Sequence, residues 1–147
     1  MSKGLFHIAL RLTFAACLFL SQFISNRSGL FSENEYLLSA GALIFMMGVV
    51  LFITASTHLK RALNHNKPAI TGPYKYIRHP IYASMYVIST GLGFLFFTWF
   101  WFMIMALFLP FWYLESKGEE NEMIRMHGDE YLNYQKSTGI FLPKLKK

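Results

Sequence analysis

Long apolar segments separated by short polar ones dominate the pattern of this 147-residue chain. A transmembrane helix needs roughly 20 consecutive, mostly apolar residues. Three segments approach or exceed that length: residues 5–24, interrupted only by Arg11, and residues 37–57 and 81–114, which carry no charge. With 54% hydrophobic and 18% aromatic residues, the composition also excludes an ordinary soluble domain. The pattern therefore predicts an all-α integral membrane protein.

The third apolar segment is too long for a single span. A continuous helix over residues 81–114 would extend about 50 Å, whereas the hydrocarbon core of a bilayer is about 30 Å thick. Two spans joined by a tight turn near Phe97-Thr98 fit better, with Trp99 at the membrane interface. We therefore expect a single membrane domain over residues 1–147, with spans at about residues 5–24, 37–57, 80–97 and 99–115.

The first apolar segment could be a span or a cleaved secretory signal. Its Phe-Ala-Ala-Cys run at residues 14–17 faintly resembles a lipoprotein cleavage site, but apolar sequence continues to Ile24. A mature lipoprotein would turn polar there, so a span is favoured. From such a span, the long side chain of Arg11 is expected to reach the headgroup region.

Basic residues set the expected orientation. The segment between the second and third apolar segments is basic, the turn near Phe97 is uncharged, and the C-terminal tail is basic again. The positive-inside rule places both basic segments in the cytoplasm, with two crossings between them. Four spans then leave both termini cytoplasmic, with residues 58–80 and 116–143 as the cytoplasmic parts. The net charge of +6 would lie beside anionic lipid, so no nucleic-acid partner is expected.

Polar and aromatic residues are concentrated at residues 71–82. The Gly-Pro pair at 72–73 marks a turn, and Pro80 restricts His79 to extended geometry, which predicts irregular backbone before the third apolar segment. Irregular backbone at membrane depth must be buried or line a cavity. Its backbone groups are therefore candidate ligand contacts, together with the side chains of Tyr74, Arg78, His79 and Tyr82. Alternatively, the basic residues are cytoplasmic anchors and the tyrosines form an interfacial belt.

A carboxylate pair, Glu119-Glu120, follows the third apolar segment at its cytoplasmic end. Acidic residues stabilise the first turn of a helix, so the pair could simply begin an amphipathic helix over residues 119–136. Gly128-Asp129 is expected to break that helix, with the glycine as C-cap and the aspartate as the next N-cap. Alternatively, the pair faces the basic residues of segment 71–82 across a ligand that carries both signs of charge.

Several short motifs recur together in the C-terminal half, at a characteristic spacing. They are Gly72-Pro73-Tyr74, Arg78-His79-Pro80-Ile81-Tyr82, Glu119-Glu120, Gly128-Asp129-Glu130-Tyr131 with Tyr134, and Pro143. In these motifs the chain resembles the isoprenylcysteine carboxyl methyltransferase and phospholipid methyltransferase family of integral membrane enzymes. The resemblance covers about half of the chain, and it implies methyl transfer from S-adenosylmethionine to a small or lipophilic acceptor at the cytoplasmic membrane face.

The resemblance also implies where the cofactor S-adenosylmethionine would bind. The implied contacts are the backbone around Ile70 and Gly72, the side chains of Tyr74, His79 and Tyr82, and the carboxylate of Glu120 or Glu119. Arg78 is the candidate for orienting a thiolate or carboxylate acceptor, and Glu119 for accepting a proton from an amine, with His127 as another candidate base. No metal site is expected.

The acceptor itself stays open at this point. Family members that act on prenylated cysteine often carry an arginine about one turn before the glutamate pair, where this chain has Glu115 and Ser116. Two other functions also stay open: a nicotinamide-dependent membrane reductase, although Gly91-Leu92-Gly93 lacks the preceding strand of a dinucleotide-binding fingerprint, and a non-catalytic membrane scaffold or lipid-binding protein. Helix packing is the favoured role of those two glycines.

Overall fold

The computed structural model describes residues 9, 11–20, 34–96 and 99–144, and these residues are predominantly helical. No strand occurs among them, and an isolated bridge pairs Ile77 with Gly139. The elements are a helical segment Arg11–Leu20, α2 (Glu35–Asn64), the short 3₁₀ helix η1 (Gly72–Lys75), α3 (Pro80–Phe96), α4 (Trp99–His127) and α5 (Asp129–Ser137). The expected all-α class is confirmed.

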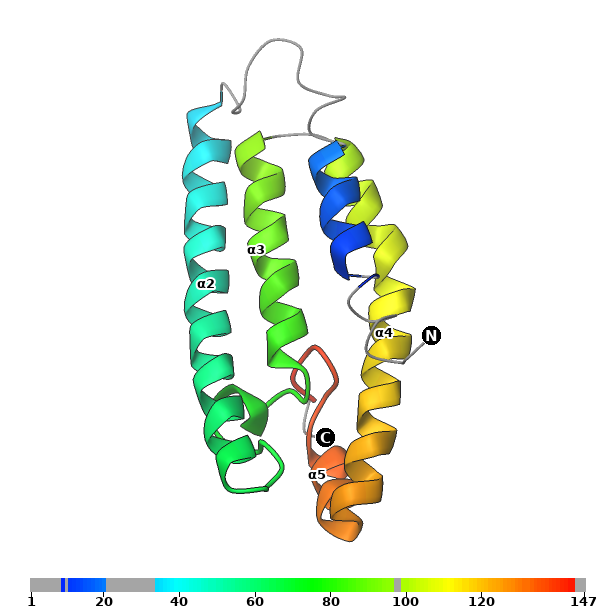
Figure 1. Ribbon diagram of the computed structural model, residues 1–147. Helices are drawn as coiled ribbons and strands as arrows, with labels where there is room; N and C mark the ends of the chain where they lie inside the picture. The colour runs from blue at the N-terminus through cyan, green and yellow to red at the C-terminus, as the bar shows by residue number, and fades with distance from the viewer. Residues whose placement is uncertain (1–8, 10, 21–33, 97–98, 145–147) are drawn as a thin grey trace.

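The longer helices lie side by side with roughly aligned axes (Figure 1). α3 stands between α2 and α4, and the segment Arg11–Leu20 lies against α4. The end of α2, η1, the start of α3 and α5 gather at one end of the bundle. Because the chain reverses direction between successive helices, segments far apart in sequence meet at that end.

Two helices, α2 and α4, are long and apolar enough to cross a membrane. Only 11% of the most apolar stretch of α2 is buried inside the protein. Large apolar side chains such as Leu43, Met46 and Val50 face outward. Such a surface suits lipid better than water. The expected total of four spans is not supported, because α3 has 17 residues and Arg11–Leu20 is shorter still. The flanks of the first expected span and the turn at Phe97-Thr98 lie outside the described residues.

The helix α4 corrects one sequence expectation. It continues without interruption from Trp99 to His127, for about 44 Å, whereas a span over residues 99–115 and a new helix from Glu119 were expected. Glu119 and Glu120 are therefore inside a helix and far from its first turn, so stabilisation of a helix start does not explain them. No proline interrupts residues 111–127, so nothing in that sequence ends the helix.

The expected break after α4 is confirmed at Gly128. Its φ of +53° lies in the left-handed region, which glycine adopts without steric cost. Gly128 is also the N-cap of α5, so Asp129 is the first residue of that helix instead of its cap. After the break, α5 runs back beside the end of α4 (Figure 1).

Glycines allow α2 and α3 to approach closely. A Cβ atom on Gly91 would lie 2.5 Å from the backbone nitrogen of Phe45, and one on Gly48 would lie 2.7 Å from the backbone nitrogen of Ile88. Such close contacts between helix backbones require small residues. The helix-packing role favoured for Gly91 from the sequence is therefore confirmed.

Replacing Gly91 by alanine should destabilise the protein. The added methyl group must push two backbones apart, so we expect the free energy of unfolding to fall by about 1–3 kcal/mol. Gly118→Ala is the matched control, since a Cβ there meets nothing within 4 Å and should raise helix stability by about 0.5–1 kcal/mol. Denaturant unfolding in detergent micelles measures both, and equal effects of the two variants would contradict the close packing.

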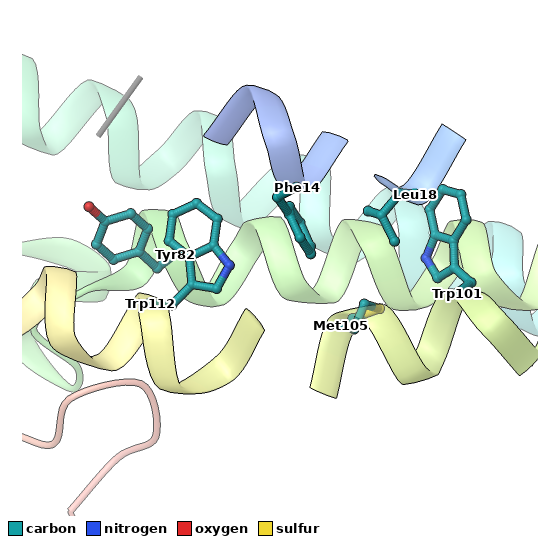
Figure 2. Close-up of a cluster of buried hydrophobic side chains, with 6 residues drawn as sticks. All are labelled: Phe14, Leu18, Tyr82, Trp101, Met105 and Trp112. Carbon is teal, nitrogen blue, oxygen red and sulfur yellow. The ribbon is translucent and has the colours of Figure 1, made fainter. Parts of the chain in front are cut away.

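The segment Arg11–Leu20 is anchored by an aromatic core between α3 and α4 (Figure 2). Phe14 lies 5.7 Å from Trp112 in an edge-to-face arrangement, and the ring of Tyr82 lies 5.1 Å from the same indole. Leu18 is buried in the same cluster. Because of this packing, Arg11, which lies one turn before Phe14, is held near the start of α3 and beside α4.

Candidate active site

A pocket of about 520 Å³ lies at the end of the bundle where the chain segments converge. This volume is within the range of about 300–1,000 Å³ that is typical of small-molecule sites. Its walls combine charged groups, phenol rings and apolar side chains. Its charged residues are Arg11, Lys67, Arg78, His79, Glu119 and Glu122; its tyrosines are Tyr74, Tyr82, Tyr131 and Tyr134; its apolar residues include Leu59, Leu63, Met85, Met123 and Met126.

The Arg-His-Pro segment is held by the chain that follows α5. The backbone amides of Arg78 and His79 donate to the carbonyls of Gly139 and Ile140, at 2.8 and 3.1 Å, and the amide of Gly139 donates to the carbonyl of Tyr76. These bonds satisfy several backbone groups that the sequence offered as candidate ligand contacts. The irregular backbone is therefore paired within the protein, as buried polar groups require.

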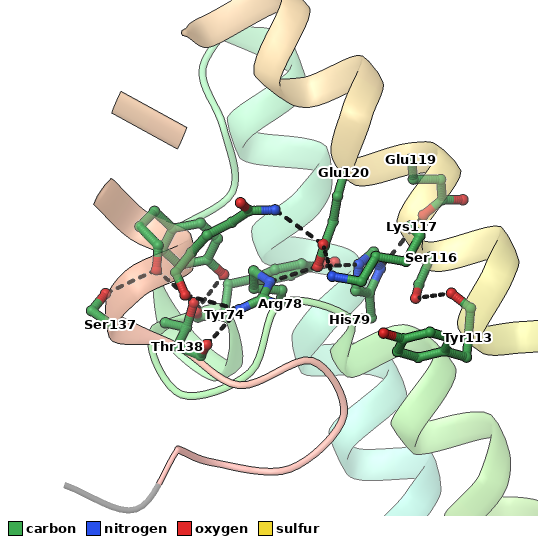
Figure 3. A network of polar contacts seen from close by, with 12 residues as sticks. Tyr74, Arg78, His79, Tyr113, Ser116, Lys117, Glu119, Glu120, Ser137 and Thr138 are labelled. Atoms are coloured by element: carbon green, nitrogen blue, oxygen red, sulfur yellow. Dashed lines mark hydrogen bonds and ion pairs between the residues drawn. The ribbon is translucent and has the colours of Figure 1, made fainter. Parts of the chain in front are cut away.

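Arg78 is enclosed instead of lying at the surface as a cytoplasmic anchor. Its side chain is 7% exposed, and its Nε donates to Oε1 of Glu120 at 2.6 Å. Its Nη1 donates to the carbonyls of Gln135 and Thr138 (Figure 3). Arg78 thus ties the segment before α3 to α4 and to the end of α5. This engagement leaves it poorly suited to the acceptor-orienting role predicted from the sequence.

Glu120 is the buried centre of the same network. Its side chain is 2% exposed, and it also accepts hydrogen bonds from Lys117 and Gln135, each at 3.0 Å. Burial opposes its ionisation, but the hydrogen bonds from His79, Arg78 and Lys117 outweigh burial and lower the pKa of Glu120 to about 2. Glu120 is absent from the pocket lining. Of the two carboxylates expected to contact a cofactor, this one is occupied by the protein itself.

Glu119 is the carboxylate that faces the pocket. Its side chain is 43% exposed, and its Oε1 accepts a hydrogen bond of 2.6 Å from the hydroxyl of Tyr82. Burial opposes ionisation here too, but the bonds to His79 and Tyr82 prevail and lower the pKa of Glu119. The pocket wall therefore presents a fixed negative charge at neutral pH.

His79 lies between the two carboxylates. Its Nδ1 is 3.5 Å from Oε2 of Glu119, and its Nε2 is 3.4 Å from Oε1 of Glu120. Burial favours the neutral ring, but the two carboxylates outweigh it and raise the pKa of His79. Its ring also stacks on Tyr82, with centroids 5.6 Å apart. A histidine whose two ring nitrogens both face carboxylates is placed to position those carboxylates and is poorly placed to act as a base toward a ligand.

Of the residues that were predicted to contact the cofactor, only some line the pocket. Tyr74, His79 and Tyr82 line the pocket, whereas Ile70 and Gly72 do not. Ile70 is exposed, and Gly72 adopts a φ of +61° so close to His58 that a Cβ atom would lie 2.4 Å from its Nε2. Gly72 thus serves the turn into η1. The candidate base His127 is also absent from the pocket lining.

Sequence reasoning missed Arg11 and Glu115 as site residues. The Nη2 of Arg11 donates to Oε1 of Glu115 at 3.0 Å and to the hydroxyl of Tyr82 at 2.9 Å. It lies 3.7 Å from Oε1 of Glu119. Arg11 therefore turns into the protein instead of extending to the headgroups. A charge inside an apolar segment usually has a partner, and Glu115, at the end of another such segment, was the available one.

Comparisons with family models, with curated proteins and with solved structures find no match for this chain. Any functional proposal therefore depends on the residues of the site and on their arrangement.

Proposed function

We propose that the protein is a membrane methyltransferase that uses S-adenosylmethionine and acts on a small or lipophilic acceptor at the cytoplasmic membrane face. The observation that carries the proposal is the ionised Glu119 on the wall of a pocket of cofactor size, beside several tyrosines. The motif resemblance led to this cofactor, and the pocket offers the groups that it needs.

The pocket residues fit the chemistry of S-adenosylmethionine. The cofactor carries two cationic groups, an ammonium and a sulfonium, for which Glu119 is the complement on the wall. It also carries a purine, for which Tyr74, Tyr131 and Tyr134 offer aromatic faces. Burial raises the pKa of Tyr131 to about 12 and that of Tyr74 further, so these phenols stay neutral.

The chemistry requires alignment more than proton transfer. When bound, S-adenosylmethionine supplies a methyl group on a sulfonium, which departs as a neutral thioether. The protein then has to hold donor and acceptor in line in a space that excludes water. Here the Arg78–Glu120 pair joins α4 to the segment before α3, and His79 lies beside the carboxylate of Glu119 on the pocket wall.

The same proposal includes four membrane crossings with cytoplasmic termini. Exposed basic side chains, among them Lys60 near the end of α2 and Lys67 and Lys75 of the α2–α3 connection, belong to the end of the bundle that holds the pocket. The positive-inside rule assigns that end to the cytoplasm. α3 would cross as the buried partner of α2, since its glycines allow close contact and its 17 residues span about 25 Å.

Ligand-dependent stability tests the proposal. S-adenosylhomocysteine at 100 times its dissociation constant should stabilise the purified protein by about 2.7 kcal/mol, while NADPH should not. Thermal unfolding in detergent measures both, and transfer of label from a labelled methyl donor to native lipid extract then identifies the acceptor. Stabilisation by NADPH alone would instead indicate a reductase, and no response to either ligand would indicate a scaffold.

A further inference from the structure

We propose that Arg11 positions the methyl acceptor and that it selects acceptors whose reacting group is an anion. The inference rests on the proposed function, and it assigns to the first helical segment the role that sequence reasoning gave to Arg78. An anionic nucleophile, such as a thiolate or a carboxylate, is the substrate chemistry that this guanidinium would favour over an amine.

The two arginine side chains of the pocket differ in their exposure and in how many of their N–H groups are hydrogen-bonded within the protein. The side chain of Arg11 is 45% exposed, against 7% for Arg78. Arg11 uses one nitrogen, Nη2, for its hydrogen bonds to Glu115 and Tyr82, and its Nη1 and Nε donate to no other group among the described residues. It therefore keeps donors in the fork geometry that binds carboxylates and other anions well.

The guanidinium is held in place before any ligand arrives. Phe14, one turn after Arg11, is 5% exposed in the aromatic core (Figure 2), which fixes the helical segment. The carboxylate of Glu115, with a side chain 2% exposed, fixes the head of Arg11. A preorganised donor loses little conformational entropy when it binds an anion.

A cationic side chain, Arg11, and an anionic one, Glu119, are adjacent on the pocket wall. Nη2 of Arg11 lies 3.7 Å from the carboxylate of Glu119, the group assigned to the cationic donor. A cationic donor beside Glu119 and an anionic acceptor beside Arg11 would therefore be brought together. An amine acceptor would enter as an ammonium ion, which has no lone pair to accept hydrogen bonds from the N–H groups of Arg11.

The reaction of an anionic acceptor balances without a base. Its lone pair forms the new bond to the methyl carbon, the carbon–sulfur bond breaks, and the bonding electron pair stays on sulfur as the sulfonium becomes a thioether. No proton has to leave the acceptor. This agrees with a site in which both ring nitrogens of His79 face the carboxylates of Glu119 and Glu120, so that His79 is not placed to act as a base.

Binding of three eight-carbon probes tests the inference without depending on turnover. Calorimetry would compare octanoate, octanethiol and octylamine on protein saturated with S-adenosylhomocysteine. We expect octanoate to bind at least tenfold more tightly than octylamine, with octanethiol gaining affinity as pH rises and its thiolate forms. Arg11→Gln should abolish the preference, Arg11→Lys should retain most of it, and Arg125→Gln, which removes an exposed cation of α4, should leave it unchanged.

A second variant keeps the test possible if Arg11→Gln fails to fold. If Arg11→Gln unfolds because Glu115 loses its ion pair with Arg11, the double variant Arg11→Gln, Glu115→Gln removes both charges and should fold and show no preference. An unchanged preference for octanoate in a folded Arg11 variant that still binds S-adenosylhomocysteine would overturn this inference alone. Failure of the wild-type protein to bind S-adenosylhomocysteine would overturn the proposed function and this inference with it.

Discussion

Replacing Arg78 by methionine is expected to lower the free energy of unfolding by about 3–5 kcal/mol, the usual cost of breaking a buried ion pair from one side. The variant leaves the carboxylate of Glu120 with a side-chain exposure of 2% and without its closest cation. It also leaves the carbonyls of Gln135 and Thr138 without the donor that joins them to α3. Denaturant unfolding in micelles, followed by circular dichroism, gives the measurement.

A double variant distinguishes the loss of the Arg78–Glu120 ion pair from the loss of side-chain packing. Arg78→Met, Glu120→Leu removes both buried charges, so it should recover a substantial part of the stability lost by Arg78→Met alone. Arg125→Met removes an exposed arginine of α4 and should change stability by less than about 0.5 kcal/mol. If Arg78→Met behaves like Arg125→Met, the Arg78–Glu120 pair does not hold the site together.

Replacing Glu119 by glutamine is expected to weaken binding of S-adenosylmethionine by tenfold or more. A hydrogen bond to a charged group contributes about 1.5–3 kcal/mol, and each 1.4 kcal/mol corresponds to a factor of ten in affinity. The fold should survive, because the glutamine oxygen can still accept the hydrogen bond from Tyr82 and because the side chain is partly exposed. Calorimetry on the purified protein measures the change.

A control variant and a second ligand make the result of Glu119→Gln specific. Glu130→Gln removes an exposed carboxylate from α5 and should leave affinity within about twofold, since surface charges interact weakly. S-adenosylhomocysteine keeps the ammonium but lacks the sulfonium, so a larger loss for S-adenosylmethionine would place Glu119 beside the sulfonium. Equal losses would place it beside the ammonium, and wild-type affinity in Glu119→Gln would remove Glu119 from the cofactor site.

The helices were largely predictable because their signals are local. Residues 37–57 and 99–114 contain no charge, and each stretch lies inside a helix long enough to cross a bilayer. The break at Gly128 was predictable because few residues other than glycine tolerate a positive φ. The continuity of α4 through Glu119 was missed, since a change from apolar to polar composition resembles a helix boundary although the backbone hydrogen bonds continue.

The candidate site was only partly predictable because its roles depend on contacts between distant segments. The motifs at residues 71–82 and 119–120 lie at the pocket, and Tyr74, His79 and Tyr82 line it. Sequence could not decide between adjacent carboxylates, because neighbouring residues on a helix point about 100° apart and only packing determines which one is enclosed. Glu120 faces Arg78 and the chain after α5, and Glu119 faces the pocket.

By itself, the sequence determined that the chain is helical and membrane-compatible, and that its chemistry-bearing residues belong to two polar segments, since composition and turn residues act locally. Only the tertiary structure decided the role of each charge. It enclosed Arg78 with Glu120, left Glu119 ionised at the pocket wall, and brought Arg11 to Glu115 across 104 positions of the chain. The physical reason is that a buried charge requires a partner, and the partners here come together only when the helices pack.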